Sequence, residues 1–232
     1  MLIEKPITLK LNEAEHLNKV AKKKKKVLMV GHTFLYNQSV LKLRELIKKK
    51  IAGKIYYINC RRTHLGLIRK DVNVIWDLAP HDISIVNFIL KKEPLNLKVS
   101  TSQFLKKGRS DVAFLNFIYP KNILTNIHLS WLDSNKCRTI EIIGSKARIL
   151  FDDLNLLEPI KIYKKKLLKK KNDQNYHLRD GNILSPQIKI KEPLFEMCKD
   201  FIKSIKYKTK PVSDFKVGYA CIKALKLSNT FN

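Results

Sequence analysis

The chain has 232 residues, 44% of them hydrophobic, which is enough for one sizeable core or for one domain with part of another. It contains no run of about 18 apolar residues, and we therefore expect no membrane-spanning helix. The amino terminus, MLIEKPITLK, lacks the basic start and apolar centre of a signal peptide. These features predict a globular cytoplasmic protein.

The formal net charge of +27 raises nucleic acid or an anionic membrane as a partner. Lysine supplies most of this charge, whereas bidentate recognition of bases and phosphates favours arginine. The lysine clusters, such as Lys22 to Lys26, are not interleaved with stacking aromatic residues. We therefore interpret most of the charge as solvated surface and do not expect a dedicated nucleic-acid function.

Neither cysteines nor histidines show the spacing of a metal site. The four cysteines, Cys60, Cys137, Cys198 and Cys221, lie far apart without a CxxC pair, which predicts reduced thiols. His32, His64 and Asp71 could each supply a ligand, but none has metal-motif spacing. No bound metal is expected.

The first thirty residues are predicted to form strand, helix and strand. An extended segment reaches Pro6, helical spacing follows at Ala14, Leu17 and Val20, and the apolar run VLMVG occupies residues 27–31. This alternation is typical of a parallel α/β sheet. A second amphipathic helix is predicted over residues 40–47, and the stretch KIYYINCRR then begins a new strand.

The middle of the chain is predicted to form a large, mostly antiparallel sheet that is covered on one face. After a helix that starts near Asp77, strands are expected at 96–104, 112–119, 123–132, 138–143, 147–152 and 158–163. Residues 164–185 are polar and rich in lysine, which predicts an exposed loop. Helical spacing returns in two segments, from Leu194 to Ile205 and from Val217 to Leu225.

The stretch VIWDLAPHD, residues 74–82, places an acid and a histidine four residues apart. Asp77 fits a helix N-cap, with Pro80 at the third helical position and His81 in the first turn. A helix amino terminus disfavours the imidazolium, so His81 would stay neutral near pH 7 and accept a proton, with Asp77 orienting it. The same stretch is also explained by a helix N-cap at Asp77 followed by a histidine that has no catalytic role.

Lys5 ends an apparent parallel strand, which is where ligands of open α/β sheets tend to lie. A lysine at this place can bind a ligand oxygen or stabilise developing negative charge. A solvated surface lysine is the alternative.

Taken together, these segments resemble the Gfo/Idh/MocA-type oxidoreductases over essentially the whole chain. The resemblance is carried, in order, by Glu4-Lys5-Pro6, by Val30-Gly31-His32 with Phe34, Tyr36 and Asn37, by Trp76-Asp77 with Pro80-His81-Asp82, and by Gly144-Ser145-Lys146 before Phe151-Asp152-Asp153.

The resemblance implies an α/β fold in which part of a Rossmann domain, residues 1–31, precedes a substrate and oligomerisation domain, residues 32–232. The second domain would contain the large open sheet with helices on one face, and its last helix would pack back on the amino-terminal part. Implied partners are a sugar-type substrate and further copies of the chain bound through the open sheet.

The resemblance also implies hydride transfer between NAD or NADP and a sugar, polyol or nucleotide-sugar carbon. By position, Lys5, Asp77 and His81 resemble the family's catalytic residues. Cofactor contacts are implied for Glu4, Lys5, Pro6, His32 and Trp76. A base such as His81 would accept the hydroxyl proton, and the Lys5 cation would favour the alkoxide-like transition state.

The chain departs from the family in one major respect, since its seven glycines form no GxGxxG fingerprint. The first nucleotide-binding half is therefore expected to be missing or to be supplied by a separate chain. We expect weak NAD(P) binding and little turnover by this chain alone. Three interpretations stay open: an incomplete dehydrogenase, a non-catalytic binding or assembly module, and a polycation-driven nucleic-acid binder.

Overall fold

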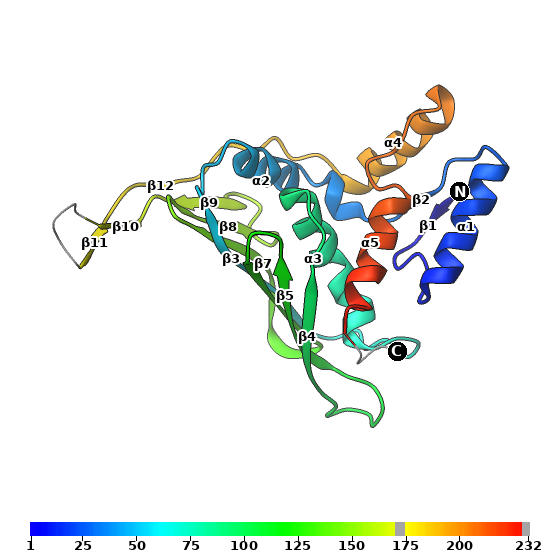
Figure 1. Ribbon diagram of the computed structural model, residues 1–232, viewed down its shortest axis with the longest axis horizontal. Helices are drawn as coiled ribbons and strands as arrows, with labels where there is room; N and C mark the ends of the chain where they lie inside the picture. The colour runs from blue at the N-terminus through cyan, green and yellow to red at the C-terminus, as the bar shows by residue number, and fades with distance from the viewer. Residues whose placement is uncertain (170–174, 229–232) are drawn as a thin grey trace.

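The computed structural model describes residues 1–169 and 175–228, and its first elements form a small parallel sheet. Strands β1 (Leu2–Ile3) and β2 (Met29–Val30) pair in parallel, with Ile3 opposite Val30. Helix α1 (Leu11–Lys23) connects them. The predicted order of strand, helix and strand is therefore confirmed. In Figure 1 this unit lies at the opposite end of the molecule from strands β9 and β12.

The centre of the molecule is an eight-stranded sheet with the order β12-β9-β8-β7-β3-β6-β5-β4. Only the contact between β3 and β6 is parallel, so the prediction of a mostly antiparallel sheet is confirmed. Its strands are β3 (Ile55–Leu65), β4 (Asn96–Ser102), β5 (Val112–Tyr119), β6 (Ile123–Ser130), β7 (Leu132–Gly144), β8 (Arg148–Asp152), β9 (Ile160–Tyr163) and β12 (Ile183–Leu184).

Helices cover one face of this sheet and leave the other open (Figure 1). The covering helices are α2 (Gln38–Lys48), α3 (Val74–Leu90) and α5 (Phe215–Leu225), and they share one core with the sheet. Because side chains alternate along a strand, Ile58 and Ile127 are buried while their neighbours face outward. On the open face Asn59, Asn126 and Asn116 lie side by side across β3, β6 and β5.

Helix α3 begins earlier than the sequence predicted, because Asn73 and not Asp77 is its N-cap. The Asn73 side chain accepts hydrogen bonds from the backbone N–H groups of Ile75 and Trp76, both at 3.1 Å. Asp77 therefore lies within the first turns, and Pro80 is inside the helix. The predictions of an Asp77 cap and of a first-turn His81 were wrong.

The sequence predicted an exposed loop over residues 164–185, but the described part of this segment contains paired strands. Strands β10 (Lys166–Lys169) and β11 (Tyr176–Arg179) pair antiparallel, and β12 joins the edge of the large sheet beside β9. Residues 170–174 of the predicted loop lie outside the described residues. The hairpin projects beyond the sheet in Figure 1, and all four β11 side chains are exposed.

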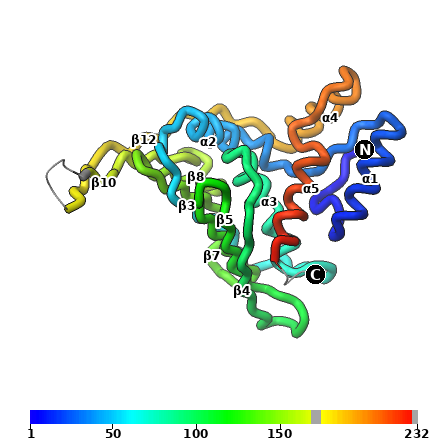
Figure 2. Tube along the Cα trace, viewed as in Figure 1, coloured from blue at the N-terminus to red at the C-terminus, as the bar shows by residue number. Residues whose placement is uncertain are grey.

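The last two helices meet the amino-terminal unit. Helix α4 (Pro193–Tyr207) packs on the short helix η1 (Thr33–Tyr36), and α5 lies against α1 and β2. Figure 2 shows that α5 thus lies beside the amino-terminal unit, although the two are far apart in the sequence. None of the helices within the described ranges combines the length and apolar character needed to cross a bilayer.

Candidate active site

Lys5 and His32 follow the two parallel strands and therefore meet at the same edge of the small sheet. Lys5 comes just after β1, and the Lys5–Pro6 peptide bond is cis. The Lys5 Nζ donates a hydrogen bond to the Asp77 backbone oxygen at 2.6 Å and lies 3.5 Å from Asp77 Oδ1. Burial lowers the Lys5 pKa, and the nearby Asp77 carboxylate opposes this shift.

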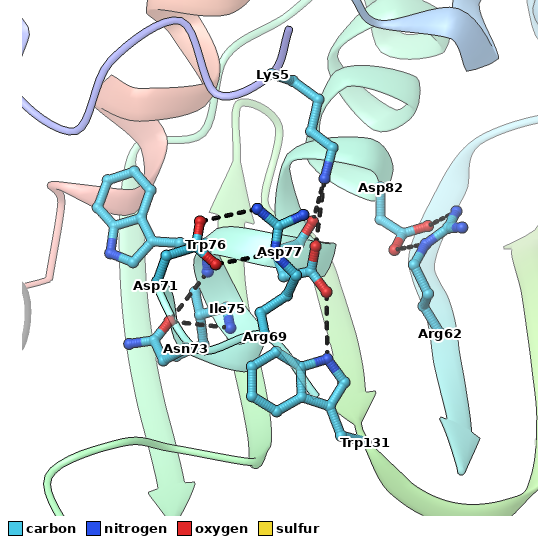
Figure 3. A network of polar contacts seen from close by, with 10 residues as sticks. All are labelled: Lys5, Arg62, Arg69, Asp71, Asn73, Ile75, Trp76, Asp77, Asp82 and Trp131. Atoms are coloured by element: carbon cyan, nitrogen blue, oxygen red, sulfur yellow. Dashed lines mark hydrogen bonds and ion pairs between the residues drawn. The ribbon is translucent and has the colours of Figure 1, made fainter. Parts of the chain in front are cut away.

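The Asp77 carboxylate joins Lys5 to the large sheet. Its Oδ2 accepts a hydrogen bond from Trp131 Nε1 at 3.2 Å, while Oδ1 faces the lysine (Figure 3). Both Lys5 and Asp77 have only 16% of their side chains exposed. The expectation that Asp77 orients His81 is replaced by a different arrangement, in which Asp77 holds Lys5 and is itself held by Trp131.

His81 lies one turn further along α3, on the side that faces η1. Its ring contacts Phe34 edge-to-face, with 5.2 Å between the ring centroids, and its Nδ1 is buried without a hydrogen-bond partner. Burial lowers the His81 pKa well below its ordinary value, and the cations of Arg62 and Lys5 act in the same direction. His81 is therefore neutral near pH 7, for reasons of burial rather than of helix position.

The second histidine, His32, is 1% exposed, and neither of its ring nitrogens has a hydrogen-bond partner in the described part of the molecule. Burial lowers its pKa from about 6.5 to about 4, and the Lys5 cation contributes. The neighbouring Gly31 allows close contact with Glu4, because a Cβ there would lie 3.1 Å from Glu4 Oε1.

The other expected cofactor residues lie around this junction. Glu4 is exposed and Pro6 is half-buried. Trp76 is half-buried and packs against both the large core and the small core of the amino-terminal unit. The predicted site residues thus gather where β1, β2 and the amino-terminal half of α3 meet.

The sequence did not reveal the buried ion pair beside His81. Arg62 donates from Nε and Nη2 to the two Asp82 oxygens at 2.8 and 3.0 Å, and the side chains are 6% and 1% exposed. The Arg62 guanidinium also lies over the Phe34 ring, 4.6 Å from its centroid. Strand alternation was an available signal, because Arg62 has the parity of the buried Ile58 and Cys60.

A second missed group follows the glycine-serine-lysine turn. Asp153 accepts a hydrogen bond from Asn37 Nδ2 at 3.2 Å and lies 3.4 Å from Arg138 Nη1. Arg138 is one of the cations that lower the His81 pKa. Arg138 therefore links this group to the electrostatic environment of the His81 imidazole, on which Arg62 and Lys5 also act.

The residues present fit only one end of a nicotinamide dinucleotide. A lysine and a buried neutral histidine at the carboxyl ends of parallel strands, with Trp76 beside them, suit the nicotinamide ring and its ribose. The 232 residues contain no GxGxxG to hold the pyrophosphate. Across residues 1–169 and 175–228, no three His, Cys, Asp or Glu side chains are grouped to hold a metal ion.

A parallel strand pair thus brings a lysine against a helix that packs on a large, mostly antiparallel sheet. In the comparison with known families, residues 40–150 match the model of the GFO/IDH/MocA C-terminal domain. This match covers just under half of the chain and agrees with the resemblance that the sequence motifs indicated.

One curated relative is the uncharacterized oxidoreductase YdgJ of Escherichia coli (strain K12). It is 25% identical over 197 residues, which are 78% of this chain and 54% of YdgJ. The chain therefore spans about half the length of this relative.

Solved structures share the fold at lower identity. UDP-N-acetylglucosamine 3-dehydrogenase GnnA from Acidithiobacillus ferrooxidans superposes with a TM-score of 0.78 and 21% identity, covering 97% of this chain and 68% of GnnA. An inositol dehydrogenase homolog from Azotobacter vinelandii, complexed with NADH and myo-inositol, gives a TM-score of 0.75 and 17% identity. That match covers 97% of this chain and 67% of the homolog.

Proposed function

We propose that this chain provides the proton-handling half of an NAD(P)-dependent dehydrogenase that acts on a carbinol of a sugar, polyol or nucleotide sugar. The observation that carries the proposal is the Lys5 ammonium, which Asp77 holds at the carboxyl end of β1, with the neutral His81 imidazole close enough for the Lys5 cation to lower its pKa. The names of the relatives YdgJ, GnnA and the inositol dehydrogenase homolog support the same class of reaction.

Each residue has a role that its surroundings favour. His81 accepts the hydroxyl proton of the carbinol, since a neutral imidazole is a competent base near pH 7. Lys5 stabilises the negative charge that develops on the carbinol oxygen. Asp77, fixed by Trp131, positions the lysine. The nicotinamide supplies the hydride acceptor when it is bound.

We further propose that Glu4, Lys5, Pro6, His32 and Trp76 surround the nicotinamide end, and that the 232-residue chain alone holds NAD(P) weakly because it lacks a glycine-rich phosphate loop. Isothermal titration of the purified chain with NADH and NADPH measures this directly. A dissociation constant in the micromolar range for either cofactor would contradict weak binding.

The activity is tested by His81→Ala at millimolar NAD+ or NADP+, with single-turnover reduction followed for myo-inositol and for UDP-N-acetylglucosamine. Loss of a general base should lower the rate at least about a hundredfold. The matched control is His16→Ala, because His16 is exposed on α1. Equal rates in the wild type and in His81→Ala would remove His81 from the mechanism, and no transfer by the wild type would exclude catalysis by this chain alone.

One observation favours a second candidate, an assembly module. Tyr57, Phe114 and Leu124 are between 41% and 52% exposed on the open sheet face. Exposed apolar patches of this kind mark interaction sites, and further copies of the chain are the partner that we propose. Sedimentation of the wild type and of Leu124→Glu tests it, since the charge should dissociate an oligomer that this face holds together.

A further inference from the structure

A cavity of about 370 Å³ lies beside the amino end of α3, next to the candidate active site. Its wall combines cationic side chains from two loops with one aromatic ring: Lys70, Lys106, Lys107, Arg109 and Trp76. The volume is within the range of small-molecule sites, about 300 to 1,000 Å³. The cavity is therefore large enough for part of a ligand and too small for a long polymer segment.

Within the described residues, no carboxylate forms an ion pair with the cationic side chains that line this cavity. Asp71 is the acidic residue of the wall, and Arg69 already binds both of its oxygens at 2.9 and 2.8 Å. The ammonium groups of Lys70, Lys106 and Lys107 make no ion pair or hydrogen bond within residues 1–169 and 175–228. A bound anion would relieve the repulsion among these like charges.

Arg109 shows that the two cationic loops are fixed relative to each other. Its Nη1 donates a hydrogen bond to the Arg69 backbone oxygen at 2.6 Å, which ties the loop after β4 to the loop after β3. Its guanidinium also lies 5.9 Å from the centroid of Trp131, the residue that holds Asp77. The cavity wall and the candidate active site therefore share their supporting contacts.

The cavity lies within reach of a substrate bound at His81. Trp76 lines it, and the next residue is Asp77. From Asn73, which also lines the cavity, α3 rises about 12 Å to His81 at 1.5 Å per residue. A ligand that places its reacting carbon at the imidazole and extends along α3 would bring its far end to the cations.

We propose that this cavity binds a phosphate or diphosphate group of the substrate. This inference rests on the proposed dehydrogenase function and narrows it, because the substrate becomes a phosphate-bearing sugar, a class that includes nucleotide-linked sugars, and not a neutral polyol. Lys70, Lys106, Lys107 and Arg109 provide the charged donors, and Trp76 provides an apolar wall.

The test is a titration of the purified 232-residue chain with inorganic pyrophosphate and with UDP, followed by calorimetry and by tryptophan fluorescence. The chain has two tryptophans, of which Trp131 is fully buried and Trp76 lines the cavity. Saturable binding of one ligand per chain should change the fluorescence. Trp76→Phe should remove most of that change, while the calorimetric binding persists.

The double variant K106Q/K107Q should weaken binding of both probes at least about tenfold. K199Q/K203Q removes the same charge from two exposed lysines of α4, far from the cavity, and should weaken binding less than about twofold. Myo-inositol should not compete with pyrophosphate. Equal weakening in both double variants would reduce the effect to net charge and overturn the inference, as would the absence of saturable binding to the wild type.

His81→Ala separates this inference from the proposed function. The variant should bind pyrophosphate as the wild type does and should lose hydride transfer. If pyrophosphate fails to bind while His81-dependent transfer from myo-inositol persists, the dehydrogenase proposal stands and the phosphate site falls. If pyrophosphate binds as expected but no hydride transfer occurs, the cavity remains an anion site and the dehydrogenase proposal falls.

Discussion

Helix α3 carries two carboxylates five residues apart, and their surroundings differ sharply. Asp82 is 1% exposed and forms two short hydrogen bonds with Arg62, which is itself 6% exposed. Asp77 is 16% exposed, lies 3.5 Å from the Lys5 Nζ, and shares its second oxygen with Trp131. Figure 3 shows both acids on this helix with their partners, Arg62 from β3 and Lys5 from the segment after β1. Both oxygens of Asp82 are bound by one buried partner, Arg62, whereas the two oxygens of Asp77 face two different side chains, Lys5 and Trp131.

The difference separates structural residues from residues available for chemistry. A bidentate pair with both charges buried has its hydrogen-bonding capacity largely used, so Arg62 and Asp82 fix the position of β3 against α3. Lys5 Nζ donates a hydrogen bond to the Asp77 backbone oxygen at 2.6 Å but lies 3.5 Å from the carboxylate, and it can exchange this longer contact for a ligand oxygen. The Lys5 and Asp77 pair is therefore the one at which we place the reaction.

The largest expected effect is a loss of stability when the buried pair of Arg62 and Asp82 is broken. Asp82→Ala would leave the Arg62 charge buried without a partner, and should lower the free energy of unfolding by about 3–5 kcal/mol. Urea denaturation measures this loss. The double variant R62M/D82L removes both charges and should recover most of the stability. A loss from Asp82→Ala no larger than that from Asp77→Ala would show that the two pairs do not differ as described.

The next effect is a pH dependence of stability that arises from His32, whose pKa is lowered by burial and by the Lys5 cation. Because the folded His32 pKa is lowered to about 4, the unfolded chain binds a proton below about pH 6.5 that the folded chain does not. The stability contributed by neutral His32 is thus present above pH 6.5 and is lost as the pH falls towards 4, by about 3 kcal/mol in total. His32→Gln should flatten this part of the stability curve. An unchanged slope between pH 6.5 and 4 would contradict it.

The smallest effect on stability is expected at the pair of Lys5 and Asp77. Lys5→Met should lower the free energy of unfolding by no more than about 1.5–3 kcal/mol, since it removes one charged hydrogen bond to the Asp77 backbone oxygen and a 3.5 Å contact with the Asp77 carboxylate. The same variant should lower hydride transfer strongly, because it removes the cation beside the carbinol oxygen. A large loss of stability without a loss of transfer would assign Lys5 a structural role.

The architecture followed from the sequence wherever the pattern was periodic. Alternation along residues 112–130 predicted β5 and β6, which are joined by a turn where Lys121 and Asn122 have positive φ angles of 70° and 56°. Local signals failed at the start of α3. Asn73 and Asp77 are both good capping residues, and Pro80 favoured the later start because proline is usually tolerated only in the first turn.

The sequence indicated which residues belong to the candidate site, but it did not indicate which of them contact one another. Lys5 and Asp77 are 72 residues apart, and no local pattern specifies that they meet. The role of Trp131 depends on the end of β6 reaching α3, which is also a long-range contact. The β10–β11 pairing was missed for a related reason, because lysine-rich composition favours a loop while pairing depends on a partner strand.

The row of asparagines on the open face has a consequence for how the sheet is aligned. Asn126 lies opposite Asn59 on one side and Asn116 on the other, and its Nδ2 donates to Asn116 Oδ1 at 2.9 Å. A slip of β6 by one residue would turn Asn126 towards the core and Ile127 towards solvent. The three amides therefore select against misaligned pairings of β3, β6 and β5, and such an error would displace Trp131, which follows β6, from α3.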